Sequence, residues 1–356
     1  MTAPLRFGVV GAGVMGGHHL RNLREMDEAV VVGVVERDPS RARRMAAQGA
    51  PVVSELAELM ERSPDAVVVA VPTSAHAEVA IPILRAGIAC LVEKPLASTV
   101  TEAEAILAAA VSSGALLAVG HVERHNPAVR FLAGLIDQGE IGSVLSYGAV
   151  RTGPMPERIG DVGVVFDLVS HDLDIVRWLA GEDPREMRAD IIRWTSGREQ
   201  EPREAALHLV ARFSSALATL DASWLHPTKT RRLHCLGTEG LVTVDYLQQE
   251  VTFARNDYEY RDWGPLVGLT GGSPGEQIRY RLQRKEPLRA ELEAFVAAIG
   301  GRPDSVVSGA DGLATVRLLA RILSDVSSGR EGSTGTGLSA LSRDGQAPTA
   351  SPSAAP

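Results

Sequence analysis

The stretch that decides the fold is Leu5-Arg-Phe-Gly-Val-Val-Gly-Ala-Gly-Val-Met-Gly-Gly-His-His19. An apolar strand over residues 5–10 runs into the pattern Gly-x-Gly-x-x-Gly and then into a helical stretch that ends near Met26. In such a turn the first glycine permits a tight bend, the second lets a pyrophosphate approach the backbone, and the third lets the helix pack on the strand. The helix N-terminus adds free N–H groups and a partial positive charge. The pattern predicts a dinucleotide-binding Rossmann unit whose cofactor contacts include Gly11, Gly13, Val14, Met15 and Gly16.

The second predicted strand, residues 30–35, ends in Glu36, which lies 20 residues after Gly16. A carboxylate at this position can accept hydrogen bonds from the adenosine ribose hydroxyls, and it repels a 2′-phosphate. The sequence therefore favours NAD over NADP as the cofactor. Arg37 follows directly, and its guanidinium could hold a 2′-phosphate, so NADP stays open as the less favoured choice.

The composition is that of an ordinary globular protein. The chain has 356 residues, 45% hydrophobic and 22% charged, which allows two domains with a sizeable core. A net charge of −8 argues against nucleic acid as a partner. The sequence shows no long apolar run and no signal peptide, so we expect a cytoplasmic protein without a membrane partner. Cys90 and Cys235 lack the number and spacing of a zinc site or disulfide framework.

Strands and helices alternate through the first third of the chain, which predicts a parallel sheet with crossover helices. We expect its later strands at residues 65–71, 88–92 and 115–119. Because open α/β sheets bind ligands beyond the carboxyl ends of their strands, the segments that follow these strands should share one rim with the glycine loop. The cofactor-binding residues expected there are Pro72, Thr73, His76, Glu93 and Lys94.

From Gly120 onward the pattern changes to long strands at close spacing. A helix is expected at residues 126–138, and strands at 144–151, 187–194, 205–213, 216–223, 231–236, 241–246 and 250–254. We therefore predict an α/β fold with two domains: a doubly wound parallel Rossmann sheet in residues 1–121, and an α/β domain with a large, mostly antiparallel sheet in residues 122–326. Residues 327–356 are rich in Ser, Gly, Ala and Pro, and a disordered tail is expected.

Lys94 is the first candidate for catalysis. It lies between Glu93 and Pro95, at the predicted end of a strand that faces a nicotinamide site. A lysine there could polarise a substrate hydroxyl or receive its proton. The alternative is a solvated surface lysine, which is the commoner environment of this residue. The place on the ligand rim favours the catalytic interpretation.

A helix predicted at residues 165–179 carries Asp167 and His171 four residues apart on one face. A carboxylate at that spacing can orient an imidazole and raise its basicity, which suits proton removal from an alcohol. Asp174 lies three residues beyond His171 and could be its partner instead. Two alternatives stay open: a helix with acidic exposed positions and a satisfied histidine, or a metal site. No metal is expected, since only one histidine lies near and no second ligand pair has suitable spacing.

Two polar segments, residues 120–128 and 151–161, each follow a predicted strand. Arg124, Arg151 and Arg158 could form a cradle for a substrate phosphate or diphosphate, although for each one taken singly a surface arginine is the commoner case. His121 and Asn126 are the other expected substrate contacts. Asn126 also suits a simpler role as the cap of the helix that follows it.

Together, the glycine loop, Glu93-Lys94-Pro95 and Asp167-x-x-x-His171 resemble the glucose-fructose oxidoreductase/inositol dehydrogenase/rhizopine catabolism family (Gfo/Idh/MocA) over about residues 5–326. The resemblance implies a Rossmann domain followed by an α/β domain whose sheet has an open face, often used for dimer or tetramer contacts. A homodimer or homotetramer is therefore expected. The resemblance also implies that Lys94, Asp167 and His171 are catalytic.

Residues 120–129 are most similar to the branch of this family that oxidises UDP-N-acetylglucosamine or related nucleotide sugars at C3. His125 departs from that branch, which usually has phenylalanine there, and residues 168–170 depart from the Asp-x-Gly-x-His form of many members. The resemblance implies an NAD-dependent dehydrogenase in which His171 takes the hydroxyl proton and Asp167 orients it. Lys94 would stabilise the alkoxide or join a proton relay. The sequence leaves open which of Lys94 and His171 is the immediate base. A free polyol, inositol or sugar-phosphate substrate, and a non-catalytic NAD-binding regulator, also remain alternatives.

Overall fold

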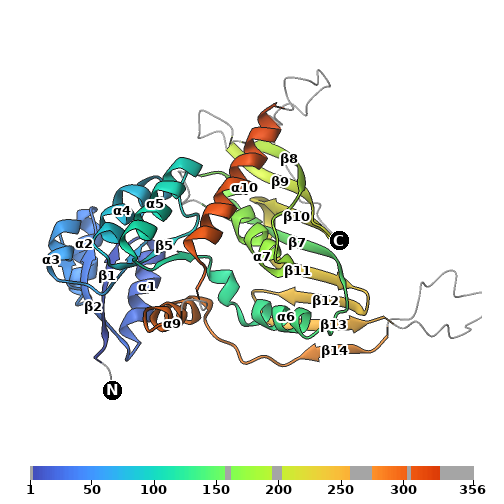
Figure 1. Cartoon of the computed structure of the whole chain (residues 1–356), viewed down its shortest axis with the longest axis horizontal. Coiled ribbons are helices and arrows are strands. Elements are labelled where there is room, and N and C mark those ends of the chain that lie inside the picture. Colours follow the sequence, from blue (N-terminus) through green and yellow to red (C-terminus); the bar gives the residue numbers. More distant parts are fainter. Residues whose placement is uncertain (1–2, 157–161, 195–202, 257–274, 303–305, 329–356) are drawn as a thin grey trace, which may run out of the picture.

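A computed structural model describes residues 3–156, 162–194, 203–256, 275–302 and 306–328, and these residues form two sheets side by side (Figure 1). The first sheet has six strands in the order β3-β2-β1-β4-β5-β6, all parallel. The predicted doubly wound sheet is confirmed. Its strands are β1 (Leu5–Val10), β2 (Ala29–Val35), β3 (Val52–Val53), β4 (Ala66–Val69), β5 (Ala89–Glu93) and β6 (Leu117–Gly120).

Crossover helices join these strands, and two of them begin with a side-chain cap. Asp38 accepts a hydrogen bond from the Arg41 N–H at the start of α2, and Thr99 forms a capping box with Glu102 at the start of α5. The third helix has no side-chain cap, and Ser54, which precedes it, bonds the Glu58 carboxylate. The helices are α1 (Val14–Arg24), α2 (Pro39–Ala47), α3 (Leu56–Glu61), α4 (His76–Arg85) and α5 (Val100–Ser113).

The second sheet has eight strands in the order β14-β13-β12-β11-β7-β10-β9-β8. Every neighbouring pair is antiparallel except β10 with β7, which confirms a mostly antiparallel sheet. The strand β14 was not expected from the sequence. The strands are β7 (Val144–Pro154), β8 (Glu186–Trp194), β9 (Arg203–Arg212), β10 (Leu217–Ser223), β11 (Leu225–Gly237), β12 (Gly240–Asp245), β13 (Glu250–Arg255) and β14 (Gln277–Tyr280).

One face of the second sheet is covered by helices, and no helix among the described residues covers the other. The helices α6 (Pro127–Asp137), α7 (Ser170–Ala180) and α10 (Gly309–Ser328) lie over one side of the strands (Figure 1). On the opposite side the apolar residues Ile192, Val210 and Leu217 are 39–50% exposed. An open, partly apolar sheet face of this kind is typical of a contact between subunits.

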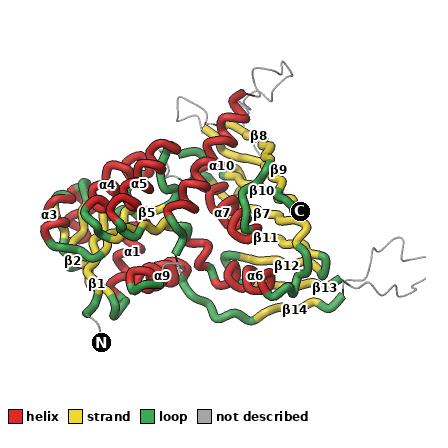
Figure 2. The backbone as a smooth tube through the Cα atoms, viewed as in Figure 1, coloured by secondary structure: helices red, strands yellow, loops and turns green. Residues whose placement is uncertain are grey.

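Two helices late in the chain return to the first sheet. On α9 (Pro287–Ile299), Phe295 is fully buried and packs edge-on against Phe7 of β1, with ring centroids 6.2 Å apart. The helix α10 contacts both α5 and β8, so it extends across both sheets (Figure 2). It ends at Ser328, beyond the expected start of the tail, and residues 329–356 lie outside the described part of the chain.

No helix in the described ranges is both long enough and apolar enough to cross a bilayer.

We predict that Phe295→Ala lowers the free energy of unfolding by about 3–5 kcal/mol, because it removes a buried aromatic ring and leaves a cavity beneath α9. Urea unfolding followed by circular dichroism would measure the loss. Val111→Ala, at a position 75% exposed on α5, is the control and should change stability by less than about 0.5 kcal/mol. Equal stability of the two variants would contradict the packing of α9 on the first sheet.

Candidate active site

The three glycines of the first turn have three different roles. Gly11 has φ +90°, and a Cβ there would lie 2.6 Å from the Ala70 carbonyl oxygen. A Cβ on Gly16 would lie 1.8 Å from the Gly11 carbonyl oxygen, so Gly16 serves the close packing of α1 on the turn and does not line the cleft. A Cβ on Gly13 would have only Arg41 Nη1 within 4 Å, at 3.9 Å. Open space in front of a bare backbone at a helix N-terminus fits a pyrophosphate.

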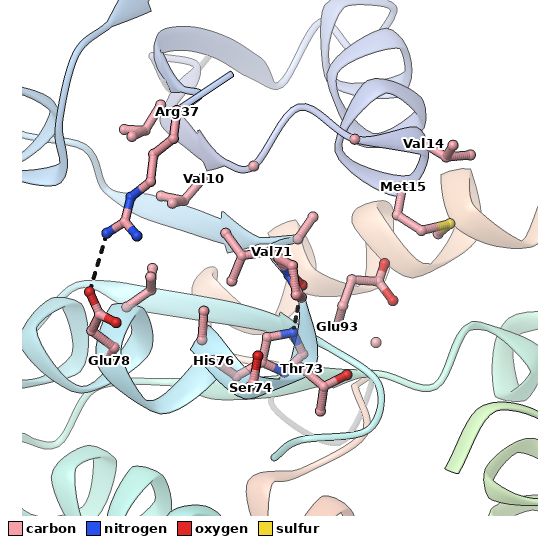
Figure 3. A pocket seen from close by; sticks show the side chains of 18 of the residues that line it. Val10, Val14, Met15, Arg37, Val71, Thr73, Ser74, His76, Glu78 and Glu93 are labelled. Carbon is pink, nitrogen blue, oxygen red and sulfur yellow. Dashed lines mark hydrogen bonds and ion pairs between the residues drawn. The ribbon is translucent and has the colours of Figure 1, made fainter. Parts of the chain in front are cut away.

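A cleft of about 810 Å³ begins at this turn and crosses the carboxyl ends of the first sheet (Figure 3). It reaches the second domain, where Val162 and Phe166 also line it. Except for Gly16, the cofactor-binding residues expected from the sequence line the cleft, and two catalytic candidates join them: Gly11, Gly13, Val14, Met15, Glu36, Arg37, Pro72, Thr73, His76, Glu93, Lys94, Asp167 and His171. The expectation of one shared rim therefore holds for these residues.

Glu36 and Arg37 lie at the end of the cleft that a ribose would occupy. The Glu36 carboxylate is held in place by the backbone N–H groups of Ala12, at 2.9 Å, and Asp38, at 2.8 Å. Arg37 is mostly exposed and donates to Glu78 at 3.2 Å (Figure 3). The carboxylate is therefore fixed beside the glycine turn, while the guanidinium bonds a carboxylate on α4.

Lys94 follows β5 and reaches across the cleft to the second domain. Its Nζ donates to the Asp167 carbonyl oxygen at 2.8 Å and to Asp167 Oδ1 at 3.2 Å. The other carboxylate oxygen, Oδ2, accepts from Trp224 Nε1 at 3.3 Å. The sequence did not single out Trp224. The signal that could have found it is a tryptophan at the end of a strand, since a buried indole N–H needs an acceptor.

The expected pairing of Asp167 with His171 is wrong. The Asp167 carboxylate bonds Lys94 and Trp224, because an ammonium attracts a carboxylate more strongly than a neutral imidazole does. The backbone also differs from the expected α-helix, since Val165–Val169 is a π-helical turn that precedes α7. Such turns are frequent at functional sites. Asp174 is not the partner of His171 either, because it bonds Arg124.

His171 is held in its neutral form. Burial lowers its pKa well below the ordinary value, and the positive charges of Lys94, Arg151 and Arg231 act in the same direction. Its Nδ1 is buried and finds no hydrogen-bond partner among the described residues. A neutral imidazole at the wall of the cleft is available as a proton acceptor.

Arg124 and Arg151 do not form the expected phosphate cradle. Arg124 binds both carboxylate oxygens of Asp174, at 2.7 and 2.6 Å. Arg151 binds both oxygens of Asp172, at 2.6 and 2.9 Å, and also Glu123 at 3.1 Å. Both arginines are buried, and neither lines the cleft. Their carboxylate partners are explained by burial, since a buried charge must be paired within the protein. Arg158, the third expected member, lies outside the described residues.

The other expected polar residues support the local backbone. Asn126 caps α6 through the Ala128 N–H and donates to the Tyr246 carbonyl, so the simpler interpretation of this residue holds. His121 is buried near Asp174 and, like Asn126, does not line the cleft. The ring of His76 lies between two backbone carbonyls (Figure 3): Nδ1 is 3.0 Å from the Pro95 oxygen, and Nε2 is 3.1 Å from the Val71 oxygen.

Glu93 is a second acidic residue near Lys94 in the cleft. His19 Nε2 lies 2.6 Å from its Oε1. Burial alone would raise the pKa of Glu93, but the hydrogen bond and charge of His19 and the charge of Lys94 outweigh it, so that the pKa is lowered. An anionic Glu93 therefore lies beside Lys94 at the end of β5.

We predict that His125 makes the protein less stable in acid. Burial, with the charges of Arg130 and Arg124, lowers its pKa from 6.5 to about 4. Below pH 6.5 the imidazole is therefore protonated in the unfolded chain but not in the folded one. The free energy of unfolding falls as the pH drops towards 4, by about 3 kcal/mol in all. Urea unfolding of the wild type and His125→Phe at pH 7.5 and 4.5 should show a smaller acid loss in the variant. His226→Phe, at an exposed position, is the control, and equal losses in all three proteins would contradict the prediction.

Comparison with known proteins agrees with this architecture. Residues 5–121 match the family model described as "Oxidoreductase family, NAD-binding Rossmann fold", and residues 129–243 match the "GFO/IDH/MocA C-terminal domain". UDP-N-acetylglucosamine 3-dehydrogenase of Acidithiobacillus ferrooxidans is 28% identical over 90% of this chain and 95% of its own. Inositol 2-dehydrogenase 2 of Saccharopolyspora erythraea is 30% identical over 91% of this chain and 94% of its own.

A solved structure extends the likeness to three dimensions. UDP-N-acetylglucosamine 3-dehydrogenase from Acidithiobacillus ferrooxidans superposes with a TM-score of 0.79 at 25% sequence identity, covering 92% of this chain and 99% of that one. Both domain matches, the near full-length relatives and the shared fold lead to one assignment. The chain belongs to the Gfo/Idh/MocA family of oxidoreductases, as a dehydrogenase with an NAD-binding Rossmann domain.

Proposed function

We propose that this protein is an NAD-dependent dehydrogenase that oxidises a nucleotide-linked sugar, UDP-N-acetylglucosamine or a relative, at the C3 hydroxyl. The observation that carries the proposal is the meeting of Lys94, Asp167 and His171 at the far end of the dinucleotide cleft. The likeness to UDP-N-acetylglucosamine 3-dehydrogenase over nearly the whole chain supports the substrate class. The Glu36 carboxylate, fixed beside the glycine turn, supports NAD over NADP.

In the proposed reaction each side chain has one task. NAD, when bound, supplies the hydride acceptor. His171, kept neutral by burial and by neighbouring cations, accepts the hydroxyl proton. Lys94 donates a hydrogen bond to the oxygen on which negative charge develops. Asp167 holds the Lys94 ammonium in place, rather than orienting the imidazole, and Trp224 fixes the Asp167 carboxylate.

A second candidate keeps the chemistry and changes the substrate to a free polyol or inositol. The relative named inositol 2-dehydrogenase 2 favours it, since it is 30% identical over 91% of this chain. Because Arg124 and Arg151 are bound to carboxylates, neither supports a diphosphate over a free sugar. The open face of the second sheet supports a homodimer or homotetramer in either case.

The substrate is tested by following the absorbance of reduced nicotinamide with purified protein. We expect NADH to form with NAD and UDP-N-acetylglucosamine, and much less with NADP or with free N-acetylglucosamine. Because an unfavourable equilibrium can hide turnover, a silent trace is repeated with an α-keto acid acceptor. Turnover of myo-inositol but not of the nucleotide sugar would establish the second candidate. A lack of turnover with all of these substrates would leave the family assignment standing and overturn the proposal of UDP-N-acetylglucosamine as the substrate.

We predict that Lys94→Ala reduces kcat at least about 100-fold while the Kd for NAD changes little. The reason is that Nζ contacts the Asp167 side chain at the reacting end of the cleft, whereas the glycine turn lies at the other end. Turnover and NAD titration of the same preparation separate the two effects. Lys285→Ala, which removes an exposed lysine, is the matched control. Parallel loss of turnover and NAD affinity in Lys94→Ala would assign Lys94 to cofactor binding or to the fold.

A further inference from the structure

Two arginines face each other across neighbouring strands of the second sheet. Arg231 of β11 is the direct antiparallel partner of Arg151 of β7. Partners in such a pair point to the same side of the sheet, and like charges directly opposite each other are destabilising. Arg151 is buried, so this side is the covered one, towards α7. The arrangement needs anions to offset both charges.

Within the described residues, only one of these two arginines is hydrogen-bonded to carboxylates. Arg151 has the carboxylates of Asp172 and Glu123. Arg231 uses Nη1 alone, which donates to the backbone carbonyls of Thr152 and Thr230. No carboxylate in the described ranges bonds it, and its Nε and Nη2 donate no hydrogen bond there. Arg231 is only partly buried, so these two donors of a planar fork are available to a bidentate anion.

The location of Arg231 is set by an irregularity in the pairing of β11 with β7. Leu225 pairs with Pro154, but Thr230 pairs with Thr152, so β11 carries three extra residues immediately before Arg231. Bulges of this kind often lie beside active sites and redirect the side chains that follow them. The three extra residues of β11 separate its exposed start from the part whose side chains alternate between the two faces of the sheet.

The Arg231 guanidinium lies near the catalytic helix, because its strand partner Arg151 bonds Asp172, the residue that follows His171. The charge of Arg231 helps to lower the pKa of His171, and the charge of Asp167 acts on Arg231 in turn. Burial lowers the pKa of Arg231, and the charge of Arg151 lowers it further. The charges of Asp172, Glu123 and Asp167 act in the opposite direction, but in the described residues no carboxylate forms a hydrogen bond with the Arg231 guanidinium.

We propose that Arg231 binds a phosphate group attached to the substrate sugar, and so selects an anionic substrate over a free sugar. The inference rests on the proposed function and supplies the contact that Arg124 and Arg151 cannot make. Nε and Nη2 would each donate to one phosphate oxygen, as a guanidinium does in bidentate recognition. The anion would also offset the repulsion between Arg231 and Arg151.

The test compares Arg231→Gln with Arg232→Gln, its matched control. Arg232 is the next residue on the same strand, it points to the other face, and its side chain is 56% exposed. With enzyme saturated by NADH, so that the glycine turn is occupied, calorimetry measures the Kd of UDP and of N-acetylglucosamine 1-phosphate. We expect Arg231→Gln to weaken both about 10- to 100-fold, Arg231→Lys to weaken them less, and Arg232→Gln to bind like the wild type.

Steady-state kinetics provide the second measurement. The expected result is a higher KM for UDP-N-acetylglucosamine in Arg231→Gln, with an unchanged KM for any free sugar that the wild type oxidises. A loss of kcat that is equal for charged and free substrates, with UDP binding intact, would overturn the inference and assign Arg231 to the electrostatics of His171. Wild-type binding of both phosphates by Arg231→Gln would overturn it as well.

The inference and the proposed function can fail separately. If the wild type oxidises no nucleotide sugar, yet UDP and N-acetylglucosamine 1-phosphate bind in an Arg231-dependent way, the phosphate site stands and the proposed reaction falls. If the wild type oxidises UDP-N-acetylglucosamine and Arg231→Gln does so with the same KM, the proposed reaction stands and the phosphate site falls.

Discussion

The contact between Lys94 and Asp167 is the interaction on which the site depends. It joins the end of β5 in the first sheet to the π-helical turn that lies against the second sheet. Both side chains are mostly removed from solvent, and such a pair is stable only when its remaining polar atoms are bonded. The Asp167 carbonyl and the Trp224 indole supply those bonds. Because α7 begins directly after this turn, the contact also fixes where His171 meets the cleft.

The features that could be predicted from the sequence are those with a local cause. The glycine turn requires its residues for steric reasons that hold in any context, as Gly11 and Gly16 show. Alternation of strands and helices predicted the parallel sheet, and close strand spacing predicted the mostly antiparallel one. The strand β14 gave no such signal, because Gln277–Tyr280 is four residues long and only partly buried. The position of the cleft residues that follow the parallel strands could be predicted from the order of strands and helices alone.

The choice of ionic partners could not be predicted in this way. Spacing along one helix places Asp167 near His171, but it says nothing of Lys94, which is 73 residues away and takes the carboxylate. Arginine side chains in polar segments suggested a phosphate cradle, yet Arg124 found Asp174 in the fold. Each of these pairings is decided by which groups are buried together, since the cost of an unpaired buried charge exceeds any local preference.

The buried arginines have a consequence for the catalytic helix. Arg124 ties η2 (Val122–His125) to Asp174, and Arg151 ties β7 to Asp172, so two successive acidic positions of α7 are held from two different elements. His171 lies immediately before Asp172 and is immobilised with the helix. An arginine held in this way cannot also follow a substrate phosphate, because moving it would leave a buried carboxylate unpaired. The proposed recognition of an anion therefore requires a guanidinium that is not bound to a carboxylate, and in the described chain Arg231, the strand partner of Arg151, has only carbonyl partners.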